Sequence, residues 1–165
     1  MKGSAMITFV AGALALISVA GGATGPVLWK QVAAGMTVEQ LRVLYPETPK
    51  LVSYKNGRVV IKGAVTIPSC GTADVEIFHG ATGVERVRAS KSDLGVFRYA
   101  CSAKVYQLMV QQYGPPSTEV PQSSGDDSIV TTWLKGPVTV IMDRTEGLNE
   151  EWTVTYAPTN AESGL

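Results

Sequence analysis

Apolar side chains recur at helical spacing in two stretches of the chain. In the first, Thr37 and Gln40 have the spacing of a capping box, and the apolar stripe that follows ends before Pro46. In the second, residues 102–113 carry apolar side chains at i, i+3, i+4 and i+7, and Gly114 supplies a C-cap. The pattern therefore predicts two short helices. The residues of the second stripe are Tyr106, Met109, Val110 and Tyr113.

Elsewhere the apolar positions alternate with polar ones, as they do in half-buried β-strands. Asn56-Gly57 is a strong signal for a tight hairpin turn. Residues 117–127 are polar and predict a mobile loop. The expected strands are 51–55, 59–67, one around Val75 and Ile77, 84–90, 128–135, 137–142 and 151–157.

This order of elements predicts an α+β fold of tandem helix-plus-antiparallel-meander units, with the helices packed on one face of the sheet. The first unit covers residues 26–99, the second covers residues 100–157, and residues 158–165 form a flexible tail. Tyr45 and Tyr113, which end the two helices, lie 68 residues apart. That offset favours an internal repeat. A single α+β domain whose elements happen to be spaced alike is the alternative.

The first 24 residues have the organisation of a secretory signal peptide, with Lys2 before an uncharged run from Ala5 to Ala20. Small residues place the expected cleavage near positions 20–23. An uncleaved anchor, which would hold the protein near a membrane, stays open as the alternative. No cysteine lies near the cleavage region, so no lipid anchor is expected. The sequence therefore predicts a periplasmic or secreted protein.

Export changes the interpretation of the two cysteines, Cys70 and Cys101. In an oxidising compartment a lone pair of cysteines is expected to form a disulfide. Such a bond would close a loop of about 32 residues and contribute roughly 3–4 kcal/mol of stability. A redox or nucleophilic cysteine is disfavoured because the sequence contains no CxxC motif and neither cysteine has an adjacent histidine or basic cluster.

The segment from Val32 to Leu44 (VAAGMTVEQLRVL) contains Gly35-Met36-Thr37 at the entry to the first helix. It resembles the helix entry of the small outer-membrane lipoprotein family called BamE, SmpA or OmlA. The resemblance implies helices followed by a three-stranded meander and a role in binding partner proteins. The Tyr113-Gly114-Pro115 ending of the second helix is similar to the ending seen in that family. Two such units in tandem look like the secreted β-lactamase inhibitor proteins.

Composition excludes several classes of function. The formal net charge is zero, whereas a nucleic-acid binder needs a basic footprint. One histidine and two cysteines cannot supply a four-ligand Cys/His zinc site. His79 falls at the tip of an expected hairpin, where a solvated imidazole is the ordinary case. No nucleophile-elbow or paired-carboxylate motif is present, so we expect no enzyme activity, no metal and no cofactor.

The zero net charge conceals a dipolar chain. Residues 50–104 carry a net charge of +5 and residues 105–165 carry −6. The two parts either attract each other or steer different partners, and cross-strand pairs explain some of the charges locally. Residues expected to form such pairs are Lys62, Asp74, Glu76, Arg86 and Arg88.

Trp133, Trp152 and Tyr156 occupy alternating strand positions. They belong to the core if they face the helix, and they form a candidate protein-binding patch if they face outward. The sequence thus predicts an exported, non-catalytic protein-binding module of the cell envelope, in outer-membrane maintenance or as an inhibitor. The alternative is a periplasmic protein that binds a small ligand or lipid. The protein partner is not identified by any motif.

Overall fold

The computed structural model describes residues 23, 25–91, 101–122, 128–145 and 151–159. Strands account for 56% of these residues and helices for 17%. The helices are α1 (Val38–Leu44) and α2 (Cys101–Tyr113). The strands are β1 (Val27–Trp29), β2 (Val32–Ala33), β3 (Val52–Lys55), β4 (Arg58–Ile67), β5 (Gly71–Gly80), β6 (Gly83–Ser90), β7 (Thr118–Pro121), β8 (Ser128–Lys135), β9 (Val138–Thr145) and β10 (Trp152–Pro158).

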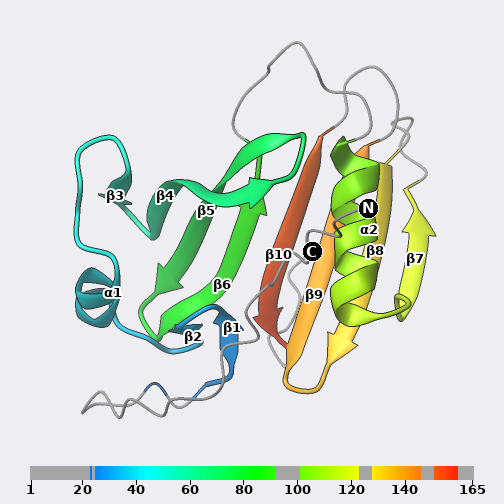
Figure 1. Cartoon of the computed structure of the whole chain (residues 1–165). Coiled ribbons are helices and arrows are strands. Elements are labelled where there is room, and N and C mark those ends of the chain that lie inside the picture. The colour runs from blue at the N-terminus through cyan, green and yellow to red at the C-terminus, as the bar shows by residue number, and fades with distance from the viewer. Residues whose placement is uncertain (1–22, 24, 92–100, 123–127, 146–150, 160–165) are drawn as a thin grey trace, which may run out of the picture.

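Eight of the described strands form one antiparallel sheet in the order β3-β4-β5-β6-β10-β9-β8-β7 (Figure 1). The short strands β1 and β2 pair with each other. The two halves of the sheet join where β6 pairs with β10, at Ala89 opposite Val154 and Val87 opposite Tyr156. This junction brings residues that lie more than 60 positions apart in the sequence into one continuous sheet.

One face of the sheet, here called the core face, is apolar across nearly its whole width. The pairing register aligns one row of side chains on this face from β3 to β8. The row consists of Tyr54, Val59, Ile77, Val87, Tyr156, Val140 and Trp133. Val59, Ile77, Val87 and Trp133 are completely buried, so this row forms the centre of the hydrophobic core.

Three elements cover the core face in turn. At one end, α1 contacts β3 through Arg42, whose guanidinium carbon lies 4.9 Å from the centre of the Tyr54 ring, and the Tyr54 hydroxyl donates to the carbonyl of Tyr45, the C-cap of α1, at 2.8 Å. In the middle, β1 contacts β6 and β10 and contributes buried Leu28. At the other end, α2 lies over β8 and β9 (Figure 1), with Tyr106 and Tyr113 beside Trp133.

Local sequence signals explain the ends of both helices. The Thr37 hydroxyl accepts from the Gln40 amide at 3.3 Å, and the Gln40 side chain accepts from the Thr37 amide at 2.8 Å. The predicted capping box is therefore confirmed. Gly114 has a φ of +77° and donates to the Val110 carbonyl, which confirms the predicted C-cap of α2. The predicted Asn56-Gly57 turn joins β3 to β4.

The predicted α+β fold of tandem helix-plus-antiparallel-meander units is wrong. The described part of the chain is mostly β, with one eight-stranded antiparallel sheet and only two helices. The pairing of β6 with β10 merges the strands into one sheet over one core, so separate units packed on a sheet do not describe the architecture. Alternation identifies strands but carries no information about which distant strands pair. The unit boundaries at 26–99 and 100–157, and the internal repeat, stay predictions.

The predicted loop over residues 117–127 is also corrected. Thr118–Pro121 forms β7, which pairs with β8 at the edge of the sheet, whereas residues 123–127 lie outside the described residues. Of the predicted tail, Pro158 belongs to β10 and residues 160–165 lie outside the described residues. The predicted signal peptide lies almost wholly outside them too. No helix in the described ranges is long and apolar enough to cross a membrane.

Candidate functional site

The face of the sheet opposite the core face, here called the open face, is not covered by any described element. Its residues alternate along each strand with those of the core face, so the register places them in rows of their own. The rows run from a charged region on β4, β5 and β6 to a region rich in threonine on β10, β9 and β8. The two regions differ sharply in chemistry.

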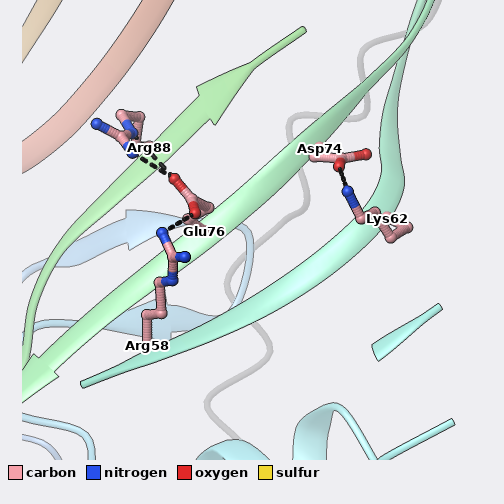
Figure 2. A network of polar contacts seen from close by, with 5 residues as sticks. All are labelled: Arg58, Lys62, Asp74, Glu76 and Arg88. Atoms are coloured by element: carbon pink, nitrogen blue, oxygen red, sulfur yellow. Dashed lines mark hydrogen bonds and ion pairs between the residues drawn. The ribbon is translucent and has the colours of Figure 1, made fainter. Parts of the chain in front are cut away.

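The charged region centres on Glu76, which lies on β5 between two arginines (Figure 2). Its Oε1 accepts from Arg58 Nη1 at 2.6 Å, and its Oε2 accepts from Arg88 Nε at 3.1 Å. Arg88 lies directly opposite Glu76 in the register, on β6. Opposite charges at such cross-strand positions stabilise a sheet by a few tenths of a kcal/mol to about 1 kcal/mol.

Phe78 is the aromatic member of the same region. It lies opposite Arg58 on one side and Arg86 on the other. The guanidinium carbons of Arg86 and Arg88 lie 4.5 Å and 5.1 Å from the centre of its ring. Both distances are in the range of cation–π attraction, which orients the guanidinium groups. We call Arg58, Glu76, Phe78, Arg86 and Arg88 the Arg–Phe cluster.

A second ion pair borders the cluster, between Lys62 of β4 and Asp74 of β5 (Figure 2). Asp74 is buried, and its Oδ1 also accepts from the Gly63 amide at 2.9 Å. Gly63 has a φ of +62° and lies where the β4–β5 register shifts. A residue with a side chain would be strained there. Asp74 therefore stabilises the irregular part of β4 as well as neutralising Lys62.

The threonine-rich region has almost no charge. The open face of β10, β9 and β8 presents Thr153, Thr155, Thr139, Ile141, Asp143, Ser128, Val130, Thr132 and Leu134. Leu134 is 55% exposed, and Val120 of the edge strand β7 is 50% exposed. This region can form hydrogen bonds through hydroxyl groups and apolar contacts at its edge.

The structure places the predicted aromatic patch in the core. Trp133 is fully buried, Trp152 is 5% exposed and Tyr156 packs against the core cluster. Trp133 Nε1 donates to the Gly114 carbonyl at 3.0 Å. Burial raises the pKa of Tyr156 well above its ordinary value near 10, and its hydroxyl is hydrogen-bonded to Tyr113. The sequence left two interpretations open for these residues, a place in the core or an outward-facing patch, and the structure supports the first. Their burial removes the basis for a protein-binding role.

The Gly35-Met36-Thr37 segment has a structural role. The Gly35 amide donates to the Val84 carbonyl, and the Met36 carbonyl accepts from the Val84 amide, both at 2.8 Å. A Cβ on Gly83 would lie 2.4 Å from the Gly35 carbonyl oxygen, so this close approach requires glycine at position 83. The segment thus fixes the start of α1 against β6 before Thr37 caps the helix.

The end of α2 is structural as well. Burial raises the pKa of the Tyr113 hydroxyl, and Gly114 both caps the helix and accepts from Trp133. Pro115 follows, where a proline cannot continue the helix.

The predicted disulfide between Cys70 and Cys101 is confirmed, with 5.8 Å between the two Cα atoms. It joins the turn between β4 and β5 to the first residue of α2. His79 donates its amide to the Gly57 carbonyl, and the described residues contain no group of three metal-ligating side chains.

The sequence identified part of the Arg–Phe cluster. The predicted cross-strand pairing is confirmed for Glu76 with Arg88 and for Lys62 with Asp74. Sequence reasoning missed Arg58 and Phe78. Phe78 lies two residues after Glu76 on the same strand, and residues two apart on a strand face the same side of the sheet. This spacing could have identified Phe78 as a member of the charged face.

Comparison with known proteins gives little further information. No family model matches the chain, and no curated protein matches it. The chain is similar to the crystal structure of a DUF4309 family protein (YjgB) from Bacillus subtilis subsp. subtilis str. 168. The two share 15% sequence identity with a TM-score of 0.48, over 80% of this chain and 88% of that chain. A likeness this distant supports no conclusion about function, and the resemblance to the outer-membrane lipoprotein family stays a prediction.

Proposed function

We propose that this chain is an exported, non-catalytic domain that binds another protein across the open face of its sheet. The observation that carries the proposal is the contrast between the two faces. The core face is covered by α1, β1 and α2, whereas the open face has no described covering element and presents the Arg–Phe cluster. A large sheet face left open in this way is suited to recognition of another macromolecule.

The size of the open face fits an ordinary protein interface. The sheet has eight strands spaced about 4.8 Å apart, and each strand is about six residues long at about 3.3 Å per residue. The product of this width and length gives the open face an area on the order of 700 Å². Specific protein–protein interfaces bury about 800 Å² on each partner. Arginine and aromatic side chains are also the types that contribute most to binding energy in such interfaces.

Export is part of the same proposal. The disulfide is consistent with an extracytoplasmic protein, because disulfides form and persist in oxidising compartments. We propose a periplasmic or secreted location on this basis and on the predicted N-terminal signal. The role in outer-membrane maintenance or inhibition is proposed with it.

The alternative, a small-ligand or lipid-binding protein, needs an apolar cavity between helix and sheet. Between α2 and the sheet that space is occupied by Trp133, with Tyr106 and Tyr113 within 6.5 Å of its ring. Packing of three large rings at this position favours the protein-binding proposal over the ligand-binding one.

Site-specific photo-crosslinking tests the proposal. A benzophenone amino acid would replace Thr155 or Leu134 on the open face, and Gln107 on the exposed side of α2 as the matched control. We expect protein adducts in the producing cells from both open-face positions and none from Gln107. The proposal fails if the open-face positions give no adduct, or if Gln107 gives the same adducts.

A further inference from the structure

We infer that the partner docks an acidic segment on the Arg–Phe cluster. This inference rests on the proposed function and specifies the chemistry of its partner. It is carried by an excess of positive charge on one half of the open face, by the fixed positions of the guanidinium groups and by the absence of described cations on the other half of that face.

The charged half of the open face carries more cations than anions. Glu76 is the only described carboxylate that pairs with Arg58 and Arg88, so two guanidinium groups share one negative charge. The Lys62–Asp74 pair is neutral. Arg86 has no carboxylate partner among the described residues, and exposed Lys55 pairs in register with Arg58 on the same face. The open face of β3 to β6 is therefore left with a net charge of +3 in the described residues, or +2 when Glu85 at the hairpin end is included.

The guanidinium groups are held in place before a partner arrives. Arg86 and Arg88 both rest on the ring of Phe78, at 4.5 Å and 5.1 Å from its centre. A guanidinium group stacked on a ring can still use its N–H edge, which matches the two oxygens of a carboxylate. Arg86 offers this edge to a partner, whereas Nε and Nη2 of Arg88 already donate to Glu76. Because the side chains lose little further freedom on binding, each new carboxylate contact costs less conformational entropy.

The charge of the other half of the open face favours a short acidic segment over an extended polyanion. Among the described residues, the open face of β10, β9, β8 and β7 presents one charged side chain, the carboxylate of Asp143, and no cation. A duplex nucleic acid or an anionic membrane surface would therefore meet no described cation on that half. A segment of a protein can place its carboxylates on the cluster and still lie against the neutral threonines of β10 and β9.

A nuclear magnetic resonance titration tests the inference. The probe is the ten-residue peptide (Glu-Thr)₅, and the control is (Gln-Thr)₅, which has the same length without charge. We expect (Glu-Thr)₅ at low salt to shift the amide signals of β4, β5 and β6, with a weaker effect as salt rises. Arg86→Gln should weaken binding about threefold to tenfold, whereas Gln107→Ala on the exposed side of α2, over the other face of the sheet, should leave it unchanged. Preserved amide dispersion would show that both variants fold.

Three results would overturn the inference: equal binding of (Gln-Thr)₅, shifts confined to other elements, or no effect of Arg86→Gln. Binding of phosphatidylglycerol vesicles with the same dependence on Arg86 would overturn it in favour of a lipid surface. The photo-crosslinking variants distinguish this failure from failure of the proposed function. If open-face adducts form equally well with Arg86→Glu added, the domain binds a protein but the acidic segment is excluded. If no adducts form, the proposed function itself fails.

Discussion

Removing the Cys70–Cys101 disulfide should cost a large part of the stability of this protein. The bond joins the turn between β4 and β5 to the first residue of α2, and the chain between the two cysteines includes β5 and β6. β6 is the strand that connects the two halves of the sheet through β10. The double variant Cys70→Ala/Cys101→Ala removes this restraint from the unfolded chain without adding a polar group to the buried site.

The magnitude follows from the sequence separation of 31 residues. Closing a loop of that length lowers the entropy of the unfolded chain enough to contribute about 3–4 kcal/mol to the free energy of unfolding. Both cysteines are buried, so the variant also loses some packing of the two sulfur atoms. For a domain of this size the melting temperature should fall by roughly 10 °C.

Urea unfolding followed by circular dichroism measures the effect. The wild type under reducing conditions should behave as the double variant does, and reductant should leave the double variant unchanged. The dependence of the free energy on urea should also steepen, because the unfolded chain without the bond is less compact. A loss below about 1 kcal/mol, with an unchanged urea dependence, would refute the loop-closure reasoning.

Three further predictions follow from buried polar contacts. Trp133→Phe removes the donor to the Gly114 carbonyl and should lower the free energy of unfolding by about 2 kcal/mol, measured in urea; a loss below about 0.5 kcal/mol would contradict the role of this bond. Asp74→Ala leaves the Gly63 amide without its acceptor and should cost about 1–3 kcal/mol, whereas Asp74→Asn keeps an acceptor oxygen and should cost less in the same assay. Burial raises the pKa of Tyr156 above its ordinary value near 10, so the unfolded chain loses this proton first and stability should fall as pH rises above about 10; urea midpoints between pH 8 and 11 should show this fall, and Tyr156→Phe should reduce it.

Features determined by neighbouring residues were predictable from the sequence. The Thr37–Gln40 capping box, the Gly114 cap and the Asn56-Gly57 turn are all confirmed. Each depends on hydrogen bonds or backbone angles within about four residues, which a local pattern specifies directly. The disulfide was predictable for a different reason. The predicted export signal implies an oxidising compartment, and the two cysteines allow only one pairing.

The architecture was not predictable in the same way. Whether β6 pairs with β10 depends on a contact between distant strands, and the alternation of each strand is the same with or without it. β7 was missed because Thr-Glu-Val-Pro is short and polar, and only its pairing with β8 makes it a strand. The sequence pattern showed that strands exist but not how they assemble into one sheet.

The same limit applies to the candidate site. Spacing of two shows that Trp152, Val154 and Tyr156 share a face, and that Glu76 and Phe78 share one, but it does not show which face is covered. Trp133 and Trp152 are large and apolar, so the fold is more stable when the face that carries them is the covered one. The arginines of β6 then necessarily point to the opposite face from Val87 and Ala89, which belong to the core.

Strand β6 connects the stability of the protein to its proposed binding surface. Val87 and Ala89 pair with β10 and pack in the core, whereas Arg86 and Arg88 extend from the same strand to the open face. Because adjacent residues of a strand face opposite sides of the sheet, the two functions can be changed independently. A substitution at Arg86 removes charge from the cluster without disturbing the core, so its effect on binding reports on recognition rather than on folding. A polar substitution at Val87 should instead weaken the junction of the two sheet halves, and any loss of binding would then follow from loss of the fold.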